Sequence, residues 1–221
     1  MKLVAAKSIL KANDQLAAEN RRGFDAASVY CVNVVGSPGC GKTTLLEALF
    51  EHLHAGLCGE GLRPAVIEGD IAGSIDAEKL EALGVPVVQI NTEGACHLDA
   101  NMTASAAGQL DLSGADFLFI ENVGNLVCTA GFDLGEHLRI VVLSVTEGDD
   151  KAVKYPAIFQ GSDALVISKL DLLPYTNFRT ERIAADMKRL APGAPVFEVA
   201  AIKRQGTCEL ARWIARKGAA P

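Results

Sequence analysis

Positive charge, aromatic side chains and long apolar runs are all scarce in this sequence. Lysine and arginine number 21 against 27 aspartates and glutamates, which gives a net charge of −6, and aromatic residues make up 5%. Proteins that bind nucleic acid or an anionic membrane need a basic face, so neither partner is expected. The longest apolar runs, Phe117–Ile120 and Ile140–Val145, are far shorter than the roughly 20 residues that span a bilayer.

No secretory leader is expected, because residues 1–7 are not followed by a long apolar stretch and a cleavage site. We therefore expect a cytoplasmic protein. Its six cysteines are then expected as thiols, metal ligands or core residues and not as a disulfide framework. With 49% apolar and 22% charged residues, the chain can bury a full core, and 221 residues fit one domain.

Apolar runs alternate with helical patterns along most of the chain. Strands are expected at Val29–Val35, Pro64–Glu68, Val85–Ile90, Phe117–Glu121, Leu138–Val145, Ala164–Ser168 and Pro195–Val199. Helices are expected at Lys42–His54, Ile75–Leu83, Leu98–Gln109, Phe178–Leu190 and Thr207–Lys217, with Thr207 as a helix cap. Strands that are apolar throughout and separated by helices predict an α/β fold, with a mostly parallel sheet flanked by helices on both faces. Residues 1–24, with a helix over 2–20, are expected as an N-terminal helical extension to a domain over 25–221.

A phosphate-binding loop follows the first expected strand and opens a helix. The sequence there is Gly-Ser-Pro-Gly-Cys-Gly-Lys-Thr, which matches the P-loop pattern in the context that the pattern requires. Backbone N–H groups and the helix N-terminus would surround the phosphates, Lys42 would neutralise the β- and γ-phosphates, and Thr43 would bind Mg²⁺. The alternative is a glycine-rich turn without a ligand. The expected nucleotide contacts are Gly36, Ser37, Pro38, Gly39, Cys40, Gly41, Lys42, Thr43 and Thr44.

A second loop indicates guanine as the base. Ser168-Lys169-Leu170-Asp171 follows an apolar strand and resembles the Asn-Lys-x-Asp motif of GTPases. In that motif the Asp accepts two hydrogen bonds from guanine and the Lys stem lies over the ring, whereas adenine would leave the carboxylate of Asp171 unpaired. Ser168 replaces the usual Asn, so we expect a weaker tether to the P-loop. A solvated Lys-x-Asp loop is the alternative.

Carboxylates end two of the expected strands, in Glu68-Gly69-Asp70 and in Glu121-Asn122-Val123-Gly124. Ligands of open α/β sheets sit at the carboxyl ends of strands, so Asp70 and Glu121 are expected to hold Mg²⁺ with Thr43 or to orient the attacking water. Gly124 is expected to donate its N–H to the γ-phosphate. Glu68 is more simply explained as an ordinary strand-end carboxylate.

Cys96, His97 and Cys128 are the strongest candidates for metal ligands. Cys96 precedes an expected helix, whose dipole would lower the pKa of its thiol. Thiolate and imidazole together suit Zn²⁺, Ni²⁺ or Cu, although three unrelated residues remain an alternative on spacing alone. His54 and Cys58 form a weaker pair, for which a solvated helix face is the simpler explanation. Cys31 is expected inside a strand and Cys208 in a structural role.

The joint pattern resembles the HypB family, the nickel-incorporation GTPases of [NiFe]-hydrogenase maturation. It is carried by the P-loop and by Glu-Gly-Asp (68–70), Cys-His-Leu-Asp-Ala (96–100), Glu-Asn-Val-Gly-Asn-Leu-Val-Cys (121–128) and Val-Thr-Glu-Gly-Asp-Asp-Lys (145–151). The related urease accessory GTPases have Cys-Pro-His, whereas Cys96 and His97 are contiguous here. The N-terminal Cys-x-x-Cys-Gly-Cys site or His-rich tract of some members is not found, so N-terminal nickel storage is not expected.

The resemblance implies a P-loop NTPase of the SIMIBI type that hydrolyses GTP with Mg²⁺. It also implies a nickel or zinc site built from Cys96, His97 and Cys128 at the interface of a nucleotide- or metal-dependent homodimer. Hydrogenase maturation proteins and the hydrogenase large subunit would be its partners. Two rival functions stay open: a metal carrier or sensor in which nucleotide is only a structural ligand, and a P-loop kinase for a small molecule. The kinase is disfavoured because no arginine cluster follows a mid-chain helix.

Overall fold

One seven-stranded parallel sheet organises the chain in the computed structural model, which describes residues 5–54, 61–70, 73 and 75–219. The strands are β1 (Tyr30–Gly36), β2 (Pro64–Asp70), β3 (Val87–Asn91), β4 (Phe117–Glu121), β5 (Leu138–Ser144), β6 (Ala164–Ser168) and β7 (Val196–Glu198). Their order is β3-β2-β4-β1-β5-β6-β7, and every pairing is parallel. The predicted fold class is therefore confirmed.

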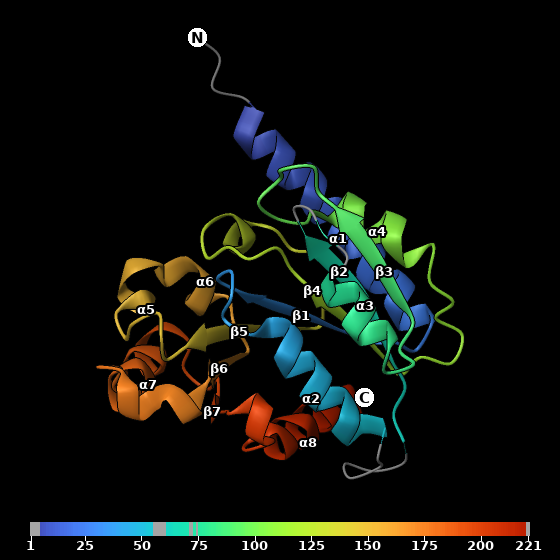
Figure 1. The fold of residues 1–221 in the computed structure, drawn as a ribbon. Coiled ribbons are helices and arrows are strands. Elements are labelled where there is room, and N and C mark those ends of the chain that lie inside the picture. The colour runs from blue at the N-terminus through green and yellow to red at the C-terminus, as the bar shows by residue number, and fades with distance from the viewer. Residues whose placement is uncertain (1–4, 55–60, 71–72, 74, 220–221) are drawn as a thin grey trace.

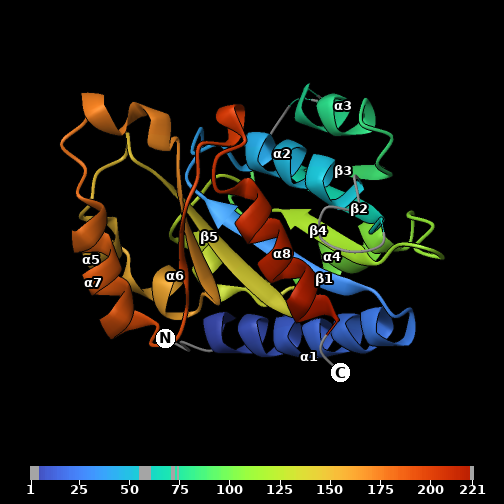
Figure 2. The ribbon, with the colours of Figure 1, turned by 90° about the horizontal axis from the view of Figure 1, so that it is seen from below.

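Helices cover both faces of this sheet (Figures 1 and 2). They are α1 (Ala5–Ala26), α2 (Lys42–His54), α3 (Ile75–Glu81), α4 (Ala100–Ala107), α5 (Lys151–Lys154), α6 (Pro156–Gln160), α7 (Thr180–Leu190) and α8 (Thr207–Gly218). Three short 3₁₀ segments are η1 (Cys128–Gly131), η2 (Leu170–Tyr175) and η3 (Ala201–Lys203). Among the described residues, no helix combines the length and apolarity needed to cross a bilayer.

The two faces of the sheet bury different helices because alternate strand residues point in opposite directions. Val34 and Val142 pack with Phe50 of α2 and with α3 and α8 on one face. On the other face, α1 and α4 cover β2 and β4, while α5, α6 and α7 cover β5 and β6. Burial on both sides explains why the strands read as continuous apolar runs.

Several expected boundaries differ from those observed. The leading helix runs to Ala26 instead of residue 20, and α5 and α6 were not anticipated. Helices α5 and α6 are short, and Pro156 separates them because it starts α6. Thr207 is not a cap, because Gly206, with φ 75°, holds that position, and the Thr207 hydroxyl instead donates to the Arg204 carbonyl at 3.0 Å.

Candidate functional site

The phosphate-binding loop lies between β1 and α2, beside the carboxyl ends of β2 and β4. A cavity of about 180 Å³ opens there, and its lining includes Gly39, Lys42, Asp70, Glu121 and Gly124. The structure thus brings together the loop lysine, both expected carboxylates and the expected γ-phosphate donor. Further lining residues are Pro38, Glu68, Gly69, Asp76, Asn122 and Val123.

Two buried carboxylates at this cavity are only partly satisfied. The Thr43 hydroxyl donates to Glu121 Oε1 at 2.9 Å, while Glu121 Oε2 and Glu68 Oε2 find no hydrogen-bond partner among the described residues. Burial raises the pKa of Glu121 to about 7 and that of Glu68 to about 8, and neighbouring acids add to both shifts. Oxygen donors of this kind, with Asp70 beside them, fit Mg²⁺ and its bound waters.

Glu68 and Asp76 also line this cavity, although sequence patterns provided no reason to place either at the site. Glu68 lies near the carboxyl end of β2, as expected, and it is 3% exposed and lines the cavity. Asp76 reaches the same cavity from the first turn of α3. No pattern marked Asp76, because its relevance depends on where α3 sits relative to β2.

A second cavity, of about 260 Å³, lies on the other side of the P-loop, where a base is expected. Its lining is Cys40, Gly41, Thr44, Ser168, Lys169, Asp171, Leu172, Ala201 and Ile202. The Lys169 ammonium donates to the Gly39 carbonyl at 2.6 Å. Ile202 is 76% exposed at the rim, an apolar contact that the sequence did not single out.

A tether to the P-loop is present at Ser168, and its weakness relative to the usual Asn stays a prediction. The buried Ser168 hydroxyl donates to the Cys40 carbonyl at 2.6 Å, which joins the two loops directly. A serine is long enough because β6 ends close to the P-loop. Cys40 itself is fully buried against the core, and burial raises the pKa of its thiol to about 11.

Cys128 comes together with the adjacent residues Cys96 and His97, although it belongs to a separate segment. Each offers a ligand atom, and these atoms all lie within 4.8 Å of one another. The side chains are half-buried, and the His97 ring stacks on Phe132 with centroids 3.9 Å apart. Two sulfurs and an imidazole nitrogen at this spacing fit Zn²⁺ or Ni²⁺.

Cys96 does not lie at the N-terminus of a helix, so the predicted effect of a helix dipole on its thiol is wrong. Helix α4 begins at Ala100, and the Asp99 carboxylate caps it by accepting from the Met102 N–H at 2.8 Å. Cys96 therefore precedes the helix by a full turn. A hydrogen bond with Cys96 raises the pKa of the Cys128 thiol, and burial lowers the pKa of His97, which favours the neutral imidazole that a metal requires.

One loop connects the metal cluster to the phosphate-binding loop. A Cβ on Gly124 would lie 2.7 Å from Pro38 Cα, so only glycine permits this approach. The Asn125 N–H donates to the Gly36 carbonyl at 2.9 Å, and Asn125 Oδ1 accepts from the Cys128 N–H at 2.9 Å. The P-loop strand and a candidate metal ligand thus share one residue, which the sequence did not single out.

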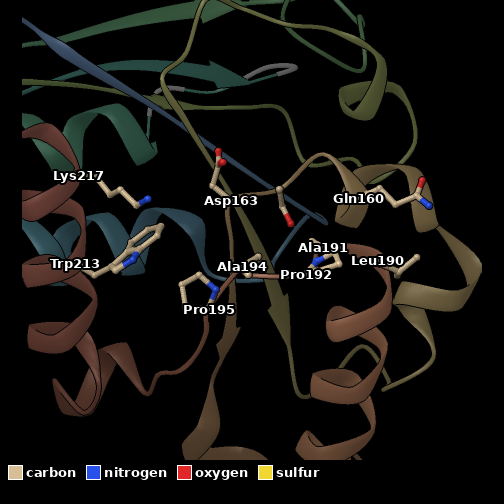
Figure 3. A pocket seen from close by; sticks show the side chains of 11 residues that line it. Gln160, Asp163, Leu190, Ala191, Pro192, Ala194, Pro195, Trp213 and Lys217 are labelled. Carbon is tan, nitrogen blue, oxygen red and sulfur yellow. The ribbon is translucent and has the colours of Figure 1, made fainter. Parts of the chain in front are cut away.

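The remaining described cysteines and one further cavity lie away from the P-loop and the metal cluster. Cys31 is buried in β1, as expected, and Cys208 is half-buried at the start of α8. Cys58, the proposed companion of His54, lies outside the described residues. A cavity of about 440 Å³ opens at the amino ends of β6 and β7, where Trp213 and Lys217 project from α8 (Figure 3). This cavity therefore lies at the opposite ends of the strands from the P-loop and the Ser168–Asp171 loop.

Comparisons with known proteins identify the relatives of this chain. A family model described as the CobW/HypB/UreG nucleotide-binding domain matches residues 30–198. Hydrogenase maturation factor HypB from Azotobacter chroococcum mcd 1 is 47% identical over 211 residues, which are 96% of this chain and 68% of that protein.

Solved structures give the same result. HypB from Helicobacter pylori in complex with nickel has a TM-score of 0.88 and 39% identity, covering 94% of this chain and 95% of that one. HypB from Archaeoglobus fulgidus has a TM-score of 0.85 and 35% identity, with 94% and 99% covered. Sequence identity over nearly the whole chain, a matching family model and a shared fold show that this chain belongs to the HypB family of P-loop nucleotide-binding proteins.

Proposed function

We propose that this protein is a GTP-hydrolysing metallochaperone that carries nickel or zinc on Cys96, His97 and Cys128 and assists nickel insertion into a [NiFe]-hydrogenase. The observation that carries the proposal is the bridge through Asn125, because it joins a metal ligand to the phosphate-binding strand. The family and fold are those of nucleotide-hydrolysing proteins. Support for nickel comes from the relative solved with nickel, and support for the pathway from relatives named as hydrogenase maturation factors.

The nucleotide would lie across the P-loop, with its base beside Asp171 and its phosphates beside Lys42. The Asp171 carboxylate would accept from two guanine N–H groups, and Lys42 would neutralise charge on the β- and γ-phosphates. Thr43, Asp70 and Glu121 would hold Mg²⁺, directly or through water, and Mg²⁺ would neutralise charge that develops on the phosphates. Gly124 lies against Pro38, and its N–H would donate to the γ-phosphate.

The metal would be cargo, and one protomer offers it three ligands at most. A water or a second copy of the chain must complete the shell, and a symmetric dimer would double the ligands near its two-fold axis. Contacts of the γ-phosphate with Gly124 would move the same loop that carries Cys128. A difference in metal affinity between the GTP and GDP states would then drive loading and release, in exchange with maturation proteins and the hydrogenase large subunit.

Multiple-turnover hydrolysis tests this function against a metal carrier whose nucleotide is only structural. We expect GTP to be hydrolysed repeatedly, ATP far more slowly, and the GTP rate to change when Zn²⁺ or Ni²⁺ is bound. Lys42→Ala should abolish turnover, and Asp70→Ala should reduce turnover more than GDP affinity. A single turnover per protein, or a rate that ignores the metal, would favour the carrier. Equal affinity for ATP and GTP would refute the assignment of the base.

A further inference from the structure

Two asparagines face inward on α1 where a surface helix ordinarily presents apolar residues. Asn13 is 6% exposed, Ala17 is fully buried, and Asn20 is partly buried. Their spacing of four and three residues places all three on one face of the helix. A buried side-chain amide has to find hydrogen-bond partners, so these positions indicate specific contacts.

Each of the two amides joins the same pair of distant segments. Asn13 Oδ1 accepts from the Ala100 N–H at 2.9 Å, and Asn13 Nδ2 donates to the Asp133 carbonyl at 2.8 Å. Asn20 Nδ2 donates to the Ala100 carbonyl at 2.8 Å and to the Leu134 carbonyl at 3.0 Å. Both backbone polar groups of Ala100 are therefore held by α1, which lies beside α4 (Figure 1).

These two segments are the ones that carry the metal ligands. Ala100 follows His97 by three residues and begins α4. Asp133 follows Phe132, whose ring stacks on His97, and the same stretch continues from η1, which begins at Cys128. The alignment of the two segments thus decides whether Cys128 lies near Cys96.

The segment that follows Cys128 packs closely against α1 at Gly135. A Cβ on Gly135, at φ 93°, would lie 2.6 Å from the Ala17 carbonyl oxygen, so only glycine allows the segment to approach the helix. Arg21 donates to Asp133 Oδ1 at 2.9 Å and to the Glu136 carbonyl at 2.9 Å. The helix is therefore fixed against this segment at several points. Because Asn13 and Asn20 also bond Ala100, they fix Ala100 relative to the same segment.

We propose that Asn13 and Asn20 are positioning residues of the metal site, which hold the Cys96–His97 segment in register with the Cys128–Phe132 segment. This inference rests on the proposed metal site. Residues that hydrogen-bond a metal ligand directly typically contribute about 10- to 100-fold in affinity, and Asn13 and Asn20 act one step further out, through Ala100. Helix α1 is then a part of the metal site, although residues 1–24 are expected from sequence as an extension to the nucleotide-binding domain.

The chemistry at Asn13 requires both a donor and an acceptor. Asn13→Asp keeps an oxygen for the Ala100 N–H but places a second oxygen against the Asp133 carbonyl. Asn13→Ala removes both bonds, and Asn20→Ala removes the other two. All three substitutions should loosen the register without touching a metal ligand or the phosphate-binding loop.

Metal competition measures the effect. The full chain is titrated with Zn²⁺ against a chromophoric chelator, and with Ni²⁺ while the thiolate-to-nickel absorption is recorded. We expect Asn13→Ala, Asn13→Asp and Asn20→Ala each to weaken Zn²⁺ binding about 10-fold, the lower end of the range for direct partners of metal ligands, and to alter the nickel absorption, with GDP affinity unchanged. Gln15→Ala, on the exposed face of the same helix, should bind like the wild type.

A second control separates positioning from general stability. Ile214→Val lies in the fully buried part of α8 on the other face of the sheet and lowers stability without reaching either segment. If the asparagine variants lower the Tm as Ile214→Val does but keep wild-type metal affinity, the positioning role is refuted while the metal site stands. If wild-type binding survives Cys96→Ala, the proposed metal site fails, and this inference fails with it. If Asn13→Ala does not fold, Asn20→Ala and Asn13→Asp decide the matter by the same criteria.

Discussion

Asn125 should transmit the nucleotide state to the metal site, so Asn125→Ala should uncouple the two. Asn125 Oδ1 accepts from the Val127 N–H at 2.7 Å and from the Cys128 N–H at 2.9 Å, while its own N–H donates to the Gly36 carbonyl. Alanine keeps the backbone bond to Gly36 but loses both side-chain bonds. The turn that carries Cys128 is then no longer fixed to the strand that enters the P-loop.

The magnitude follows from the two lost bonds. Each neutral hydrogen bond contributes about 0.5–1.5 kcal/mol, so their loss costs about 1–3 kcal/mol. Val127 is 63% exposed, so water replaces part of this loss and the lower half of the range applies. About 1.4 kcal/mol corresponds to a tenfold change in an equilibrium constant, so Zn²⁺ affinity should fall roughly tenfold.

The assay is a competitive Zn²⁺ titration of the GDP form and of the form with a non-hydrolysable GTP analogue. In Asn125→Ala, the affinity for Zn²⁺ should fall, and the difference in Zn²⁺ affinity between the GDP form and the GTP-analogue form should shrink. Asn125→Asp is the matched control, because its carboxylate accepts from the same two N–H groups and should preserve both properties. Wild-type affinity and an undiminished nucleotide effect in Asn125→Ala would refute the coupling route.

Three further predictions concern the nucleotide side. Asp171→Asn should shift preference from guanine to xanthine nucleotides, as measured by competition for a fluorescent GDP, and unchanged preference would contradict the assignment of the base. Ser168→Ala should weaken GDP binding about fivefold, since it removes a buried bond to the Cys40 carbonyl worth about 1 kcal/mol. Glu68 has a folded-state pKa raised to about 8, so the folded state holds its proton more tightly than the unfolded chain. In metal-free, nucleotide-free protein, the stability linked to this proton should be lost as pH rises from about 4.5 to about 8. Urea unfolding at about pH 4.5 and at about pH 8 should show that Glu68→Gln reduces the change in the free energy of unfolding between these two pH values. An equal change in the two proteins would show that Glu68 ionises normally.

The sheet was predictable because its strands are buried on both faces. Val34 and Val35 point to opposite cores, so neither position tolerates a polar residue and the run reads as a strand. Helices α5 and α6 escaped because each is about one turn long, too short for a 3.6-residue period to register. The leading helix was expected, but its end at Ala26 has no cap signal in the sequence.

Sequence motifs predicted most of the candidate site, whereas contacts between residues far apart in sequence were visible only in the structure. The P-loop and Asp171 were marked by spacing, and the structure places each at a cavity where a nucleotide is expected. The contribution of Asn13 depends on Ala100 and Asp133, which are 87 and 120 residues away in sequence. No local pattern reports such a pairing, although a buried-face asparagine repeated after seven residues was an available signal.

The most direct measurement of the central claim is a reciprocal titration of the wild-type chain. Zn²⁺ affinity is measured with GDP and with a non-hydrolysable GTP analogue, and affinity for each nucleotide is measured with and without Zn²⁺. We predict that Zn²⁺ binding requires Cys96 and Cys128 and differs between the nucleotide forms by the same factor by which Zn²⁺ changes the preference between the nucleotides. Identical Zn²⁺ affinity in both forms, or full binding after both cysteines are replaced by alanine, would contradict the account.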